Sequence, residues 1–285
     1  MKKIITTILG LSINLLALFS PKKAGRLGFM LFCKPFRGRI TDYHKQFLFS
    51  SDQFSFEHDG ITIQAYRWGH GPKNILFLHG WQSHTFRWKA YIESLDKDEY
   101  SVFAFDAPGH GLSGGSFLNV PYYGEIILQL IETIGQIDTL VGHSLGSFST
   151  LYMLHQKPSV NVKKLILMAP PGEANDFIEF YRQTLGLSNR SMTLIKDQFR
   201  QEFKKPITWF STTRFVATVE IPGLIIHDEG DAEAPYRYAT SINAAWSRSN
   251  LITTKGLGHN LKSKEVVNMV TSFIKNEQLP VMSLN

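Results

Sequence analysis

Short apolar runs recur along the chain and alternate with longer segments of mixed polarity. The runs occupy residues 74–78, 100–105, 138–141, 164–168, 223–226 and 250–253. Because the segments between them have the length of helices, the pattern predicts strands that alternate with helices. Strands connected in this way pair in parallel and are covered on both faces. We therefore expect an α/β fold with a mostly parallel central sheet flanked by helices.

This alternation is interrupted at two places. Before the first run, residues 54–56 and 61–63 alternate in polarity around Asp59-Gly60, which is typical of an antiparallel hairpin. Between the runs at 164–168 and 223–226, residues 172–217 are too many for one connecting helix and are rich in aromatic side chains. We expect this second segment to form an insertion.

Ser144 stands at the centre of a Gly-x-Ser-x-Gly pattern at residues 142–146, directly after the run at 138–141 and before a segment typical of a helix. A serine held in a sharp turn between strand and helix, with glycines relieving the crowding, forms a nucleophile elbow. Its hydroxyl is a weak nucleophile until a histidine removes its proton and a carboxylate orients that histidine. The pattern predicts a serine hydrolase whose acid and histidine follow Ser144 in the chain.

Both groups follow Ser144 in that order. The run at 223–226 leads into a segment that contains Asp228 and Asp231, and the run at 250–253 leads into a glycine-rich segment that ends in His259. His259 is the predicted base, and an aspartate of the earlier segment is the predicted acid.

An oxyanion formed during acyl transfer needs backbone N–H donors that already point at it. One donor should come from the residue after the nucleophile, which is Leu145. The other should come from a loop after an earlier strand, and the candidate is Trp81, which follows the run at 74–78.

Taken together and in this order, these motifs resemble the α/β-hydrolase fold superfamily, in its serine esterase, lipase and serine-peptidase branch. The resemblance covers roughly residues 55–275 and rests on the segments 79–81, 106–113, 142–146 and 256–259. The family's acid normally follows a Gly-x-x-Asp pattern with a proline four residues later. Asp231 keeps that offset to Pro235, whereas Asp228 stands where the family has glycine. The resemblance implies a triad of Ser144, Asp231 and His259, with Asp228 as the rival acid.

The resemblance also implies that residues 172–217 form a helical cap or lid. Aromatic side chains of such a cap could wall an apolar acyl pocket and exclude water, or could simply hold the insertion to the core. The pocket candidates are Phe177, Phe180, Tyr181 and Trp209.

The remaining histidines have structural explanations. His79 and His143 are expected to form hydrogen bonds beside the oxyanion loop, and His110 is expected to shape a loop under the site together with Asp106. Ordinary surface or packing roles are assigned to His84, His155 and His227. The chain has no His, Cys or Asp cluster with metal-ligand spacing and no phosphate-binding glycine loop, so we expect neither a metal nor a cofactor.

Positive charge is concentrated at the N-terminus. The net charge is +6, but residues 1–45 contain nine basic residues and one acidic residue, so the other 240 residues carry −2. The basic character therefore belongs to the N-terminal segment and is no evidence for a nucleic-acid-binding core. We expect no nucleic-acid partner.

The same segment contains an apolar stretch at residues 4–19, which allows three interpretations. Cleaved export is disfavoured because polar residues such as Asn14 interrupt the stretch and no small-residue cleavage site is convincing. The stretch is also short for a spanning helix. It could instead pack as an extra helical layer on the enzyme body, or bring residues 1–45 into peripheral contact with an anionic membrane. Cys33 is the only cysteine, which favours a cytoplasmic protein, with membrane association as the alternative.

Three parts are expected: a basic helical extension at residues 1–50, a hydrolase core at 51–171 and 218–278, and the cap at 172–217. The predicted reaction is hydrolysis of a small-molecule carboxylic ester or thioester through an acyl-enzyme intermediate. The alternatives are a lipase or an amide-bond hydrolase on the same triad, and a non-catalytic binding protein on the same fold. No sequence feature sets the oligomeric state.

Overall fold

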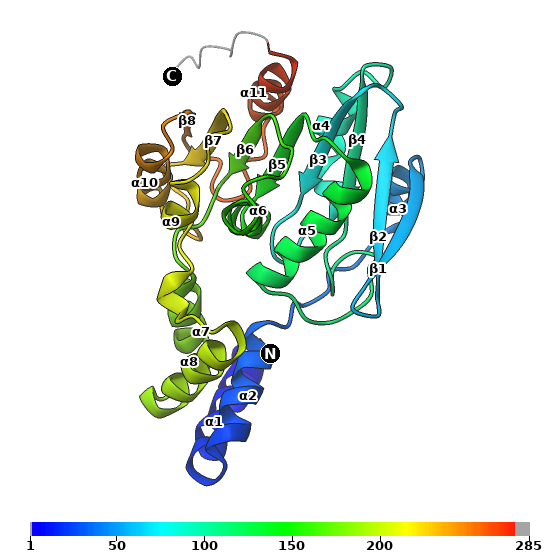
Figure 1. Cartoon of the computed structure of the whole chain (residues 1–285). Coiled ribbons are helices and arrows are strands. Elements are labelled where there is room, and N and C mark those ends of the chain that lie inside the picture. The colour runs from blue at the N-terminus through cyan, green and yellow to red at the C-terminus, as the bar shows by residue number, and fades with distance from the viewer. Residues whose placement is uncertain (1, 277–285) are drawn as a thin grey trace. The chain divides into compact units, whose positions relative to one another are not determined.

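In the computed structural model, which describes residues 2–276, eight strands form one sheet (Figure 1). Their order is β1-β2-β4-β3-β5-β6-β7-β8. β2 runs antiparallel to both β1 and β4, and every other neighbouring pair is parallel. The mostly parallel sheet predicted from the alternating pattern is confirmed. The strands are β1 (Asp52–His58), β2 (Ile61–Trp68), β3 (Lys73–Leu78), β4 (Tyr100–Phe105), β5 (Thr139–His143), β6 (Leu165–Met168), β7 (Gly223–Asp228) and β8 (Ser249–Thr254).

Helices cover both faces of this sheet. Because side chains alternate along a strand, Ile75 and Phe77 of β3 point to one face, where they pack with Trp88 and Val270. On the opposite face Tyr123 packs edge-on against Phe105 of β4. The helices around the sheet are α3 (Asp42–Leu48), η1 (Thr85–Trp88), α4 (Lys89–Glu93), α5 (Val120–Ile134), α6 (Leu145–Gln156), α9 (Thr212–Val216), α10 (Arg237–Ala245) and α11 (Lys264–Lys275).

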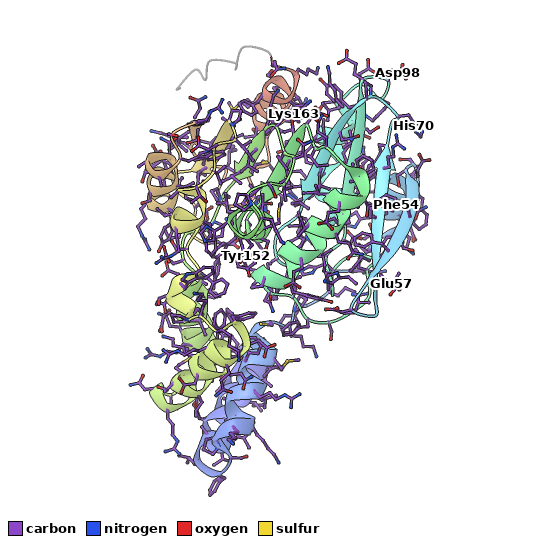
Figure 2. All side chains as sticks on the ribbon, in the orientation of Figure 1. Phe54, Glu57, His70, Asp98, Tyr152 and Lys163 are labelled. Carbon is purple, nitrogen blue, oxygen red and sulfur yellow. The ribbon has the colours of Figure 1, made fainter. Side chains whose placement is uncertain are left out.

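The sheet and its helices belong to one compact unit, which we call the sheet unit and which comprises, among the described residues, 35–172 and 212–276. Residues 2–34 and 173–211 form a second compact unit, which we call the helical unit. Figure 2 shows the side chains that fill the two units. The helical unit contains α1 (Lys2–Phe19), α2 (Pro21–Phe32), α7 (Ala174–Leu185), α8 (Asn189–Phe203) and η2 (Ile207–Trp209).

Within the helical unit the N-terminal helices pack on the insertion. The ring of Phe29 in α2 meets Phe199 and Phe203 of α8 edge-on, and Phe32 meets Tyr181 of α7. The extension and the insertion, expected from the sequence as separate parts, lie in one compact unit. The physical reason is that the aromatic side chains of the insertion need apolar partners, and α2 supplies them. The predicted core boundary at residue 278 lies outside the described residues.

Asn14 and Gly10 of α1 face the insertion. Asn14 Oδ1 accepts hydrogen bonds from Ser188 N–H and Ser191 Oγ, both at 2.8 Å, and Asn14 Nδ2 donates to Gly186 O at 3.0 Å. One turn earlier, a Cβ added to Gly10 would lie 1.7 Å from the carbonyl oxygen of Leu185. α1 therefore approaches α7 as closely as only glycine allows.

This close approach predicts the effect of Gly10→Ala. Because the obstructing atom is backbone, α1 must move away from α7, and we expect a loss of about 1–3 kcal/mol of local stability. Hydrogen exchange should show faster exchange across residues 2–34 and 173–211. Gly38→Ala is the control, since nothing lies within 4 Å of a Cβ there. Equal protection in both variants would contradict the packing described.

Candidate active site

Ser144 occupies the turn between β5 and α6 with φ 51° and ψ −119°. A non-glycine residue in this region of backbone space carries strain of about 1–3 kcal/mol and needs surroundings that hold it there. Part of that support is the hydrogen bond from Ser144 N–H to Met168 O at 2.9 Å, which ties the turn to the end of β6. The residue predicted as nucleophile thus sits in the strained strand-to-helix turn that the elbow pattern implies.

The two glycines of the elbow allow close packing around this turn. A Cβ on Gly146 would lie 2.5 Å from Leu78 O and 2.8 Å from His79 O. A Cβ on Gly142 would lie 2.7 Å from Ser147 N. All these atoms are backbone and cannot rotate aside. The start of α6 can therefore meet the end of β3 only with glycine at 146, and can lie this close to the end of β5 only with glycine at 142.

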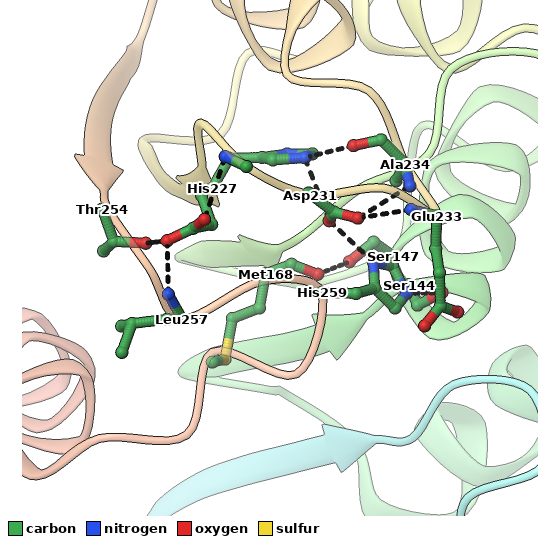
Figure 3. Close-up of polar contacts among 12 residues, drawn as sticks. Ser144, Ser147, Met168, His227, Asp231, Glu233, Ala234, Thr254, Leu257 and His259 are labelled. Carbon is green, nitrogen blue, oxygen red and sulfur yellow. Dashed lines mark hydrogen bonds and ion pairs between the residues drawn. The ribbon is translucent and has the colours of Figure 1, made fainter.

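Figure 3 shows Ser144, His259 and Asp231 in one connected group. Ser144 Oγ lies 2.9 Å from His259 Nε2, and His259 Nδ1 lies 2.7 Å from Asp231 Oδ2. The Asp231 side chain is fully buried and the His259 side chain is 11% exposed. With its proton on Nδ1, His259 donates to Asp231 and leaves Nε2 free to accept the Ser144 proton.

The Asp231 carboxylate is held on both oxygens. Oδ1 accepts hydrogen bonds from Glu233 N–H at 2.8 Å and Ala234 N–H at 2.9 Å, while Oδ2 faces His259 and His227. Burial alone would raise the pKa of Asp231. The hydrogen bonds from His227, His259 and Ala234 outweigh burial and hold the pKa of this carboxyl well below its usual range. Asp231 is therefore ionised at neutral pH.

Asp228, the rival acid, has other partners. Its Oδ2 accepts from Thr254 Oγ1 at 2.8 Å and from Leu257 N–H at 2.9 Å, and its Oδ1 accepts from Gly230 N–H at 3.0 Å. These bonds tie the end of β7 to the end of β8 and to the loop that leads into His259. The structure thus brings Asp231 to His259, and it places Asp228 where it shapes the loop before His259.

His227, expected from the sequence to have an ordinary surface or packing role, contacts the Asp231 carboxylate. Its side chain is fully buried, with Nε2 2.7 Å from Ala234 O and 3.3 Å from Asp231 Oδ2. The Nε2–H can donate to both oxygens, which links the Asp231 carboxylate to the turn that carries it (Figure 3). The sequence contained a signal, because a histidine that directly continues an apolar run is buried and must find a polar partner.

The loop after β3, which contains Trp81, lies against the elbow. A Cβ on Gly80 would lie 2.9 Å from Ser144 Cβ, so this backbone passes beside the nucleophile. Gln82, the residue after Trp81, has φ 53° and donates its N–H to His110 Nε2 at 3.0 Å. This hydrogen bond anchors the loop directly after Trp81. The other predicted donor, Leu145, begins α6, where backbone N–H groups have no partner within the helix.

His79 and His110 are neutral hydrogen-bonding residues beneath this loop. His79 donates from Nδ1 to Gly80 O at 2.8 Å and accepts Ala107 N–H at Nε2. His110 likewise donates from Nδ1 to Pro108 O and accepts at Nε2. Only a neutral imidazole both donates and accepts. Burial, with a smaller contribution from His110, lowers the pKa of His79 to about 3, and burial also lowers the pKa of His110.

Two further predicted structural residues are buried next to these loops. His143 donates from Nε2 to His259 O at 2.8 Å, and burial holds the pKa of His143 well below its usual value. Asp106 accepts from Tyr66 Oη, Thr85 N–H and Leu112 N–H at 2.8–2.9 Å. These bonds fix the loop after β4.

The pocket candidates belong to the helical unit. Tyr181 Oη donates to Gly28 O at 3.0 Å, so this side chain holds α7 to α2. Trp209 packs against Phe210, and Phe180 is 69% exposed. Phe177 is half-buried on α7. A part for these four residues in substrate binding stays a prediction. Among residues 2–276, no group of three His, Cys, Asp or Glu side chains is arranged to hold a metal ion.

Comparison with known proteins finds relatives that are similar over most of this chain. The AB hydrolase superfamily protein YisY of Bacillus subtilis (strain 168) is 24% identical over 265 residues, which covers 76% of this chain and 96% of that protein. The bifunctional esterase/perhydrolase DCH of Acinetobacter calcoaceticus is 23% identical and covers 73% of this chain and 92% of that protein.

Solved structures share the fold. Est1E of Butyrivibrio proteoclasticus, solved with ferulic acid bound, superposes with a TM-score of 0.62 at 20% identity. The match covers 78% of this chain and 96% of Est1E. The family model described as serine aminopeptidase, S33, matches residues 70–259, which include the elbow, both aspartates and His259. The chain therefore belongs to the serine aminopeptidase S33 family and is an enzyme of the α/β-hydrolase type.

Proposed function

We propose that this enzyme hydrolyses small-molecule carboxylic esters or thioesters through an acyl-enzyme intermediate on Ser144. The observation that carries the proposal is the hydrogen-bonded chain from Ser144 Oγ through His259 to Asp231, with contacts of 2.9 and 2.7 Å. A serine, a histidine and a buried ionised carboxylate in this order form the arrangement that activates a hydroxyl for attack on a carbonyl.

In the proposed mechanism His259 Nε2 takes the proton of Ser144 Oγ as that oxygen attacks the substrate carbonyl. His259 then gives the proton to the leaving group, and water cleaves the acyl-enzyme by the same steps. Asp231 stays ionised and orients the imidazole. The backbone N–H groups of Leu145 and Trp81 are the proposed donors to the oxyanion.

Ester hydrolysis is preferred to amide hydrolysis because one of the reported relatives is named an esterase. The family description names aminopeptidases, so amide-bond hydrolysis is the competing chemistry. A cytoplasmic location, and peripheral membrane contact through residues 1–45, stay predictions. Within residues 2–276 we find no helix both long and apolar enough to cross a membrane.

The first test compares the enzyme with Ser144→Ala. The unchanged protein should react with a fluorophosphonate probe and turn over p-nitrophenyl esters, and Ser144→Ala should lose both, with kcat reduced by about a thousandfold or more. Ser147→Ala, on α6 three residues after Ser144, is the matched control. Aminoacyl p-nitroanilides run in parallel decide the bond type, because faster cleavage of the anilides would overturn the ester assignment.

The acid is tested by Asp231→Asn beside Asp228→Asn. Asp231→Asn should lower kcat by about a thousandfold, because an amide cannot stabilise the imidazolium that forms on His259. Asp228→Asn keeps an acceptor for Leu257 N–H, so it should retain kcat within about tenfold while the melting temperature falls by a few degrees. The reverse pattern of kcat, with both variants folded by circular dichroism, would make Asp228 the acid.

His227 is tested by His227→Leu beside His227→Gln, which keeps a donor. Loss of one hydrogen bond to a charged group should lower kcat by about 10- to 100-fold in His227→Leu. The pKa of Asp231 is lower in the folded protein than in the unfolded chain, where it is about 4. The ionised carboxylate therefore stabilises the fold above about pH 4, and this stabilisation is lost as the pH falls. The melting temperature of His227→Leu should therefore lie furthest below that of the unchanged enzyme at neutral pH, and the gap should narrow below about pH 4.

His70→Leu, at an exposed histidine, is the control for this series. A gap in melting temperature that does not change with pH would mean that His227 only fills space.

A further inference from the structure

A large apolar face of α1 is open to solvent. Side chains at Ile4, Ile8, Leu11, Leu15 and Leu18 follow helical spacing and are each 58–64% exposed. The last residue of α1, Phe19, and two residues of α2, Leu27 and Met30, are also exposed. A helix at the surface of a globular protein normally turns such a stripe toward the core. A contiguous exposed apolar face marks a site of interaction.

Specific contacts on the opposite side of α1 fix this outward orientation. Asn14 makes three hydrogen bonds to residues 186–191, and Arg190 Nε donates to Ala17 O at 3.0 Å. Gly10 touches the backbone of Leu185. Rotating α1 to bury its leucines would break these bonds and place bulky side chains where only glycine fits. α1 therefore buries Gly10, Ile13 and Ala17 and leaves most of its large apolar side chains outside.

Charge distinguishes the occupant of this face. Residues 1–34 contain six basic residues and no acidic residue, and residues 173–211 contain six basic and five acidic residues. The helical unit thus carries +7, whereas the rest of the chain carries −1. Lys22, Lys23 and Arg26 of α2 are exposed and follow directly after the apolar face in the chain. A second copy would bring two strongly positive units together, whereas an anionic surface would complement them.

We propose that the exposed face of α1 inserts into the interface of an anionic lipid bilayer, with Lys22, Lys23 and Arg26 on the lipid head groups. An apolar stripe next to basic side chains is the pattern of helices that lie in the membrane surface. Such a helix gains affinity from its buried apolar area and from each basic residue near the anionic lipid. This surface is separate from the proposed acyl chemistry, so either proposal can fail alone.

The experiment measures sedimentation of the full chain with vesicles of phosphatidylcholine, with or without phosphatidylglycerol. No turnover is needed, so the result does not depend on esterase activity. The unchanged protein should bind the anionic vesicles. Leu11→Glu/Leu15→Glu should weaken that binding on the order of 100-fold, and Leu11→Ala/Leu15→Ala, which keeps helix propensity, should weaken it less. Phe49→Glu, at an exposed apolar residue of the sheet unit, should bind as the unchanged protein does.

The charge contribution is measured with Lys22→Gln/Lys23→Gln/Arg26→Gln. Binding to anionic vesicles should fall on the order of 100-fold. The matched variant Lys157→Gln/Lys262→Gln/Lys275→Gln removes equal charge from exposed positions of the sheet unit and should bind normally.

The proposal would be overturned if the unchanged protein bound neither kind of vesicle. It would also be overturned if Leu11→Glu/Leu15→Glu bound anionic vesicles as tightly as the unchanged protein does. A dimer by light scattering that dissociates in Leu11→Glu/Leu15→Glu, without vesicle binding, would assign the face to a second copy instead.

Discussion

Ser144 holds a backbone conformation that residues with a side chain avoid, and the surrounding sheet unit must supply the energy that keeps it there. The Met168 carbonyl anchors its N–H, and the close contact of Gly146 with Leu78 and His79 leaves α6 no room to relax. These supports come from β3, β5 and β6, which are neighbours in the sheet. The position of the serine hydroxyl is therefore a property of the parallel sheet as a whole, and any change in strand register would displace it.

Two aspartates three residues apart have different contacts around His259. Asp228 holds the loop that leads to the histidine, through Thr254 and Leu257, while Asp231 contacts the imidazole itself. A buried carboxylate is costly unless several donors satisfy it, and each aspartate accepts at least three hydrogen bonds. The imidazole is thus restrained twice, once through its backbone and once through Nδ1. His227 extends this restraint to the turn that carries Asp231.

The sequence predicted what depends on local pattern and on motifs. Alternating apolar runs predicted the parallel sheet, and glycine spacing predicted the turn at Ser144. It did not reveal that α2 packs on α8, because a contact between residues as far apart in the chain as Phe29 and Phe199 does not affect the local periodicity of apolar residues. It also missed the link from His227 to Asp231, since the bond depends on a turn whose shape is set by Asp228. The direction of α1 was equally hidden, because Asn14 finds its partners more than 170 residues away.

Electrostatics around the proposed base depends on histidines that stay neutral. The imidazole of His143 lies 5.0 Å from that of His259 between ring centres, and a second positive charge there would oppose the imidazolium that the proposed mechanism forms on His259. Burial removes that possibility, because it holds the pKa of His143 well below neutrality and the ring donates only from Nε2. His79 and His110 are kept neutral in the same way beside the loop that contains Trp81. In the proposed mechanism His259 can therefore gain its charge opposite Asp231 without repulsion from a second positive charge on His143.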